Sequence, residues 1–87
     1  AEWGLVNHVC PAAKLLSVAM ETASALAANA PVAVRQAKHA IRSGVGMPLA
    51  AGLNFEIEAY KRTVTTADRR EGVAAFNEKR KPDFSGR

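Results

Sequence analysis

Cysteine is almost absent from this sequence, since Cys10 is the only one among 87 residues. A single cysteine forms no disulfide within the chain and no metal site with other cysteines. His8 and His39 lack carboxylate or cysteine neighbours at ligand spacing, which disfavours a zinc site. We therefore expect no metal, a reducing location in the cytoplasm or an organellar matrix, and a Cys10 side chain that packs as a small buried hydrophobe.

Large aromatic residues and long apolar runs are also scarce. The chain has three Phe, one Trp and one Tyr, and much of its apolar content is alanine, which favours helix but buries little area. A chain of this length makes one domain at most and buries only about 60% of its unfolded surface. No apolar run approaches the roughly 18 residues of a membrane span, and no signal peptide is visible. We expect no membrane association and a thin helical core that would gain from covering a partner.

The usual catalytic and phosphate-binding motifs are missing, including G-x-G-x-x-G, the P-loop and G-x-S-x-G. Glu56 and Glu58 stand two residues apart, so a helix would point them in different directions. They suit a solvated helix surface better than an acid–base pair. Because no nucleophile, general base or oxyanion hole is evident, we expect the 87 residues to be catalytically inactive alone.

Acidic residues do not balance the basic ones in the later part of the chain. The formal net charge is +4, and from Lys61 onward there are eight basic and four acidic residues, against four of each before it. A basic end suggests an anionic partner, such as a phosphate, a nucleic acid or an acidic protein face. An ordinary solvated surface explains the same charges and stays open as an alternative.

Helical periodicity dominates the sequence after residue 10. Apolar residues recur at helical spacing in 11–28, 31–42, 48–64 and 66–80, so we predict an all-α fold of about four helices. Residues 11–87 form a helical domain on this reading. Residues 1–10 would be the end of a core domain or a linker, with a brief strand in 4–9. The start without Met, at AEWGLVNHV, suggests a fragment.

Proline and polar residues predict where the helices begin and end. Pro31 and Pro48 suit first helical positions, and Thr65 and Thr66 are N-cap candidates. Asp68 followed by Glu71 would then place acids in the first turn of the last helix, which the macrodipole favours. Pro82 would end that helix after Arg80, with Phe84 as an anchor for the tail.

The third predicted helix has two apolar sides. Phe55 lies on one side with two alanines, whereas a clean stripe runs along the other. A helix of this kind usually contacts two partners, although a partly exposed Phe is common. The second predicted helix pairs one apolar side with a basic side of three cations. The stripe is Leu49, Leu53, Ile57, Tyr60 and Val64, and the basic side is Arg35, Lys38 and Arg42.

Three stretches carry a family resemblance: GLVNHVCP, then NAPVAVRQAKHAI, then GLNFEIEAY followed by TTADRREGVAAFNEKRKPDF. Their order and spacing resemble the C-terminal third of the enoyl-CoA hydratase/isomerase family, the crotonase superfamily. The resemblance implies a parent with an α/β spiral fold, whose larger N-terminal part holds the oxyanion-binding amides and the catalytic acids. We therefore assign no catalytic residue to this chain. The resemblance leaves the reaction type and the acyl chain open.

The resemblance also implies what this part does. In the family the helical domain drives trimer formation, often extended to a dimer of trimers, and covers as a lid the active site of its own or a neighbouring subunit. The last helix can present a ring and a lysine to the adenosine end of coenzyme A bound to an adjacent subunit. Those positions match Phe76 and Lys79, which at i and i+3 would share a helix face. The substrate would be an acyl-CoA thioester, with no prosthetic group. Three alternatives stay open: Phe76 as a core or interface residue, Lys79 as an ordinary helix-end cation, and Arg80 as a substitute phosphate contact.

Two further hypotheses compete with an acyl-CoA enzyme. The first is a non-catalytic oligomerisation or interaction module, which the two apolar sides of the third helix favour. The second is a basic nucleic-acid-binding module, which the late cationic residues favour. The nucleic-acid hypothesis is the weaker one, because no recognition helix with base-reading residues is visible and aromatic residues are sparse.

Overall fold

All 87 residues are described by the computed structural model, which contains four α-helices, one short 3-10 helix and no strand. The elements in chain order are η1 (Ala12–Lys14), α1 (Leu15–Ala27), α2 (Pro31–Gly44), α3 (Leu49–Val64) and α4 (Ala67–Asn77). The all-α prediction is confirmed. The strand predicted in 4–9 is wrong, because residues 1–11 form an irregular segment and the chain offers no second strand to pair with.

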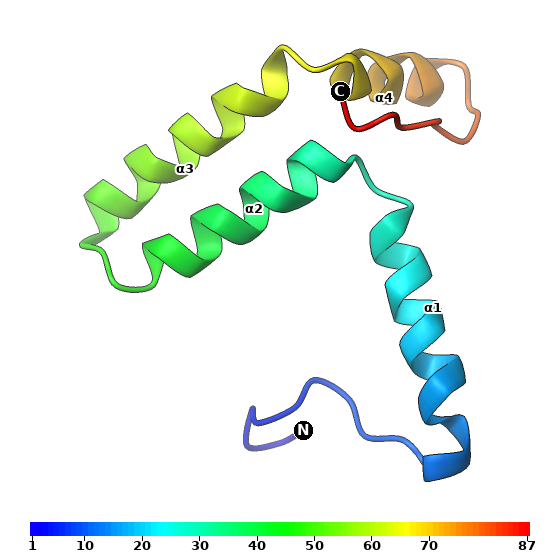
Figure 1. Cartoon of the computed structure of the whole chain (residues 1–87). Coiled ribbons are helices and arrows are strands. Elements are labelled where there is room, and N and C mark those ends of the chain that lie inside the picture. Colours follow the sequence, from blue (N-terminus) through cyan, green and yellow to red (C-terminus); the bar gives the residue numbers. More distant parts are fainter.

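The helices form an open arrangement rather than a closed bundle. Figure 1 shows α2 and α3 side by side as an antiparallel hairpin, with α1 leaving the hairpin at a steep angle. The bend between the η1–α1 segment and α2 is 104°. Ala30 takes the extended conformation at this bend, with ψ at 117°, because a residue before proline avoids the helical region. No single helix is long and apolar enough to cross a membrane. Taken together, the two segments on either side of this bend reach the required length and apolar composition.

Small residues bring α2 and α3 close together. A Cβ on Gly52 would lie 3.8 Å from the backbone oxygen of Gly44, and Ala59 is buried. The Phe55 ring is half-buried and meets His39 edge-on, with ring centroids 5.0 Å apart. The side of α3 that carries Phe55 therefore packs on α2. Four of the five stripe residues of α3 stay exposed, namely Leu49, Leu53, Ile57 and Tyr60.

The tail after α4 folds back along that helix, so that the C-terminus lies near the start of α4 (Figure 1). A Cβ on Gly72 would lie 3.6 Å from the Phe84 ring, which confirms Phe84 as the anchor of the tail. Two residues later, a Cβ on Gly86 would lie 3.5 Å from the Pro31 ring. The tail thus packs on α4 and also touches the first residue of α2.

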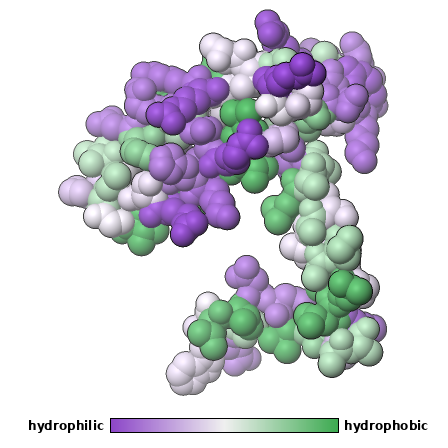
Figure 2. All heavy atoms as spheres, viewed as in Figure 1, coloured by the Kyte–Doolittle hydropathy of each residue, from purple (hydrophilic) through white to green (hydrophobic).

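The interior is very small. Only Ala59, Asp68 and Ala75 are buried, which confirms the thin core, and Cys10 is half-buried rather than buried. Figure 2 shows apolar side chains on the surface of the N-terminal segment and of α1. A face of this kind normally packs against something. The exposed apolar residues of this region are Trp3, Leu5, Val6, Val9, Leu15, Leu16, Met20 and Leu26.

Candidate functional site

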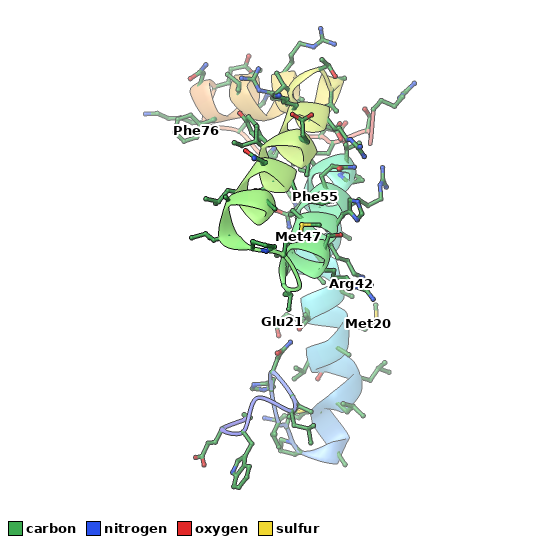
Figure 3. All side chains as sticks on the ribbon, turned by 90° about the vertical axis from the view of Figure 1, so that its left-hand side faces the viewer. Met20, Glu21, Arg42, Met47, Phe55 and Phe76 are labelled. Atoms are coloured by element: carbon green, nitrogen blue, oxygen red, sulfur yellow. The ribbon has the colours of Figure 1, made fainter.

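Phe76 lies in the last turn of α4 with its ring in solvent. Its neighbour Ala75 takes the inward position on the helix and is buried, whereas Phe76 is 83% exposed. Figure 3 shows the ring projecting outward from α4. Phe76 is therefore not a core residue of this chain, and its apolar face is open to a ligand or to another protein surface.

Lys79 lies outside the helix, in a left-handed turn. α4 ends at Asn77, so the prediction that α4 continues to Arg80 is wrong. Lys79 has φ of 55°, its N–H donates to the carbonyl of Phe76 at 3.3 Å, and the Arg80 N–H donates to the carbonyl of Ala75 at 3.0 Å. These two bonds form a Schellman motif. The Schellman turn, and not a shared helix face, sets the position of Lys79 relative to Phe76.

Arg80 is held by two carboxylates. Its Nη1 and Nη2 donate to the two oxygens of Glu71 at 2.5 and 2.9 Å, and its Nε donates to Glu78 at 2.6 Å. The hydrogen bonds from Arg80 and from the Asp83 amide lower the pKa of Glu71 from 4.5 to about 2, and Glu71 and Glu78 together raise the pKa of Arg80. Lys79 forms no salt bridge. Of the two neighbouring cations, Lys79 is the one left for a ligand.

Asp68 fastens the end of the tail to the start of α4. Asp68 is 2% exposed, and its carboxylate accepts hydrogen bonds from the Ser85 N–H at 2.7 Å, the Ser85 hydroxyl at 3.2 Å and the Gly86 N–H at 2.9 Å. Its own N–H donates to the carbonyl of Arg87 at 3.1 Å. We call this set the tail clasp. The sequence suggested only a favourable charge at a helix N-terminus for Asp68, and missed the clasp.

A basic face covers one side of α2, as the sequence predicted. Five polar residues of that helix line a shallow hollow of about 380 Å³ that contains no apolar side chain. α2 has no acidic residue, and none of its cations forms a salt bridge. Figure 3 labels Arg42 at the end of this face. The lining residues are Arg35, Lys38, His39, Arg42 and Ser43.

An apolar groove of about 760 Å³ runs between α2 and α3. Leu49, Leu53 and Tyr60 of the α3 stripe belong to one wall, and the other wall includes Ala33, Ala37 and Ile41 of α2. The Oε1 atom of Gln36 is buried in this region without a hydrogen-bond partner. A buried polar atom of this kind normally has a hydrogen-bond partner. The groove therefore offers both an apolar surface and one hydrogen-bond acceptor that no residue of this chain uses.

Catalytic groups do not converge in the structure. Glu58 pairs with Lys61 at 2.6 Å, whereas Glu56 lines the groove, so the two carboxylates do not work together, as predicted. No group of three histidine, cysteine or acidic side chains could hold a metal ion. The end of α4 offers an exposed ring and a cation without a salt bridge, and the groove offers an uncovered apolar surface.

Comparison with known proteins gives the family. The family model described as enoyl-CoA hydratase/isomerase matches residues 1–87. The chain is 51% identical over 85 residues to YngF of Bacillus subtilis, named as an enoyl-CoA hydratase/isomerase. This alignment covers 98% of this chain and 33% of YngF. The chain is 42% identical over 84 residues to the 2,3-dehydroadipyl-CoA hydratase of Escherichia coli, covering 97% and 33%.

A solved structure agrees with these relatives. The enoyl-CoA hydratase of Bacillus anthracis superposes with a TM-score of 0.96 at 45% identity, over 99% of this chain and 33% of that one. The chain thus spans about a third of the length of the proteins that it matches. The match runs from the first residue to the last, and it confirms the resemblance seen in the sequence: this chain belongs to the enoyl-CoA hydratase/isomerase family.

Proposed function

We propose that this chain is the C-terminal helical part of an enzyme that acts on acyl-CoA thioesters, and that it contributes coenzyme A contacts and assembly surfaces. Residues 11–87 would form the helical domain, and residues 1–10 would join it to the core. The observation that carries the proposal is the pairing of an exposed ring, Phe76, with an unpaired cation, Lys79, at one end of α4. The family membership supplies the ligand class, because its members are named for CoA thioesters.

The two residues have different tasks in this proposal. Phe76 offers a flat apolar face to the adenine ring, and base–aromatic contacts are worth about 1–3 kcal/mol in nucleic-acid complexes. Lys79 offers a point charge to the ribose 3′-phosphate or to the pyrophosphate, and a hydrogen bond to a charged group is worth roughly 1.5–3 kcal/mol. Together they bind and orient the ligand but move no proton.

The reaction itself belongs to residues outside this chain. Asp68 and Glu71 are both engaged by the tail, and Glu58 is paired with a lysine. The parent enzyme would add water to a 2-enoyl-CoA or shift its double bond, with an oxyanion hole that holds the thioester enolate and carboxylic acids that move protons. The 87 residues alone would be inactive, in the cytoplasm or in an organellar matrix.

Isothermal titration of coenzyme A tests the binding role. The protein expressed from its complete open reading frame is compared with its Phe76→Ala and Lys79→Ala variants. We expect the Kd for coenzyme A to rise about tenfold in each, which corresponds to about 1.4 kcal/mol. In turnover assays KM would rise and kcat would stay within about twofold, because neither residue touches the reacting atoms. Lys81→Ala removes another exposed cation and serves as the control. A coenzyme A affinity unchanged in both variants would refute the proposal.

The exposed apolar groove favours a second role, in assembly. Leu49, Leu53 and Tyr60 in this groove are each at least half exposed. Exposed apolar surface of this kind is usually covered by a partner. We infer a homo-oligomer, a trimer or a dimer of trimers, in which this face packs against protein. Analytical ultracentrifugation of Leu53→Glu should show smaller species. Arg62→Gln, which changes the net charge by the same amount on the same helix, should leave the assembly intact, and equal behaviour of both variants would argue against this interface.

A further inference from the structure

Lys79 has a backbone conformation that lysine ordinarily avoids. It is the only non-glycine residue of the chain with positive φ, and glycine is the usual residue at this position of a Schellman motif. A side chain in the left-handed region is disfavoured because its Cβ approaches the backbone. Residues held this way persist only where the surroundings enforce the conformation.

The surroundings that enforce it centre on one carboxylate of α4. Glu71 accepts two hydrogen bonds from the Arg80 guanidinium, directly after Lys79 in sequence, and a third from the Asp83 N–H at 2.8 Å. The bonded residues enclose Lys81 and Pro82, and proline fixes its own φ. The segment 80–83 is thereby attached to the middle of α4, and Lys79 is the link between the end of the helix and this fixed segment.

The other carboxylates of the region do not perform this task. Asp68 binds Ser85 and Gly86, at the far end of the tail. Glu78 contacts Arg80 through Nε, but it is itself part of the turn, and its side chain is 60% exposed against 24% for Glu71. Of the two carboxylates within α4, only Glu71 binds the segment 80–83 that directly follows Lys79.

We propose that Glu71 is a positioning residue for the coenzyme A contact of Lys79. Glu71 does not touch the ligand. It fixes the path of residues 80–83, and through that path it fixes the direction in which the Lys79 ammonium points. This inference rests on the proposed role of Lys79. Phe76 belongs to the helix before the turn, so its contact does not depend on Glu71.

A double-mutant cycle on the Kd for coenzyme A tests the inference, using the protein expressed from its complete open reading frame. Lys79→Ala should weaken binding about tenfold, and Glu71→Gln should weaken it about three- to tenfold. The double variant should bind no worse than Lys79→Ala alone, because without the ammonium there is nothing left to position. Glu78→Gln, the matched control, removes the same charge from Arg80 and should change the Kd by less than twofold.

Arg80→Lys provides a second variant that keeps the positive charge but loses the two-pronged contact with Glu71. It should weaken binding as Glu71→Gln does, and likewise only while Lys79 is present. Hydrogen exchange at the Arg80 amide, which caps α4, should accelerate in both variants. This readout follows the turn directly and does not involve the ligand.

The outcomes separate the inference from the function beneath it. If Lys79→Ala leaves the Kd for coenzyme A unchanged, the proposed coenzyme A contact of Lys79 is refuted. The positioning role of Glu71 is then refuted as well, because it depends on that contact. If Lys79→Ala weakens binding and Glu71→Gln does not, the coenzyme role stands and the positioning role is overturned. Additive losses in the double variant would also overturn it, since they would mean that Glu71 acts on the fold in general and not through Lys79.

Discussion

The tail clasp gives the sharpest stability prediction. Asp68→Asn keeps the size of the side chain but replaces the carboxylate, which accepts hydrogen bonds from two backbone N–H groups and one hydroxyl, with a neutral amide. Hydrogen bonds to charged groups are worth about 1.5–3 kcal/mol and neutral ones about 0.5–1.5 kcal/mol. Over the two backbone donors the difference amounts to about 2–3 kcal/mol, and the free energy needed to open the tail would fall by that amount.

Hydrogen exchange measured by mass spectrometry on a peptide that covers residues 78–87 provides the assay. A change of about 1.4 kcal/mol corresponds to a factor of ten, so exchange at Ser85 and Gly86 should accelerate by about 30- to 150-fold. Asp83→Asn is the matched control, because the structure gives the Asp83 carboxylate no hydrogen bond while its backbone N–H stays on Glu71. Exchange that rises by less than threefold in Asp68→Asn would refute the clasp as the source of the tail's order.

Three further predictions concern the turn, the pH dependence and the basic face. Lys79→Gly should stabilise the protein by about 0.5–1 kcal/mol in chemical denaturation, because glycine takes positive φ without strain, while it weakens coenzyme A binding; a loss of stability would contradict the reading of the turn. The pKa of Glu71 is lowered from 4.5 to about 2, so the stability that its carboxylate contributes is complete above pH 4.5 and is lost as the pH falls through 2. Slow hydrogen exchange at the Asp83 amide, after correction for the intrinsic rate, should therefore persist at pH 3.5 and disappear near pH 2. Loss of this protection already near pH 4.5 would contradict the prediction. The basic face should bind DNA or RNA only weakly, with a salt slope no steeper than about −3 for three phosphates in fluorescence anisotropy; nanomolar binding at physiological salt would revive the nucleic-acid hypothesis.

Local signals in the sequence predicted most of the fold. Pro31 and Pro48 mark the starts of α2 and α3 to within a residue, because proline suits a helix start and nothing later in a helix. Thr66 caps α4 as predicted, with its hydroxyl accepting a hydrogen bond from the Arg69 N–H at 3.1 Å. These features depend on neighbours within one turn, so the printed residues are enough to find them.

Features that join distant residues escaped prediction. The end of α4 was placed too late, because the left-handed residue is Lys79 and not the glycine that usually marks such a stop. The clasp joins residues 17 and 18 positions apart, and no periodicity reports such a pairing. The two acids at i and i+3 near the start of α4, Asp68 and Glu71, were the only available signal, and charge at a helix N-terminus explained them too easily.

Phe76 and Lys79 show the same division at the site. The sequence and the resemblance predicted both residues as coenzyme A contacts, and that role stays a prediction. The left-handed turn decides where Lys79 lies, because it removes Lys79 from the helix face that carries Phe76. The Phe76 ring itself stays exposed. Arg80, which the sequence left open as a phosphate contact, is occupied by Glu71 and Glu78. Which of two adjacent cations is free depends on a carboxylate nine residues away, and composition alone contains no such information.

The near absence of an interior has a consequence for how a whole enzyme containing this part would fold. Two alanines and one aspartate are the only buried residues here, so the helices would gain most of their burial from surfaces outside these 87 residues. Until those surfaces are in place, the exposed apolar side chains are ones that chaperones and proteases recognise as incomplete folding. Substitutions on the outward faces of α1 and α3 would then lower protein levels even where the helices themselves remain sound.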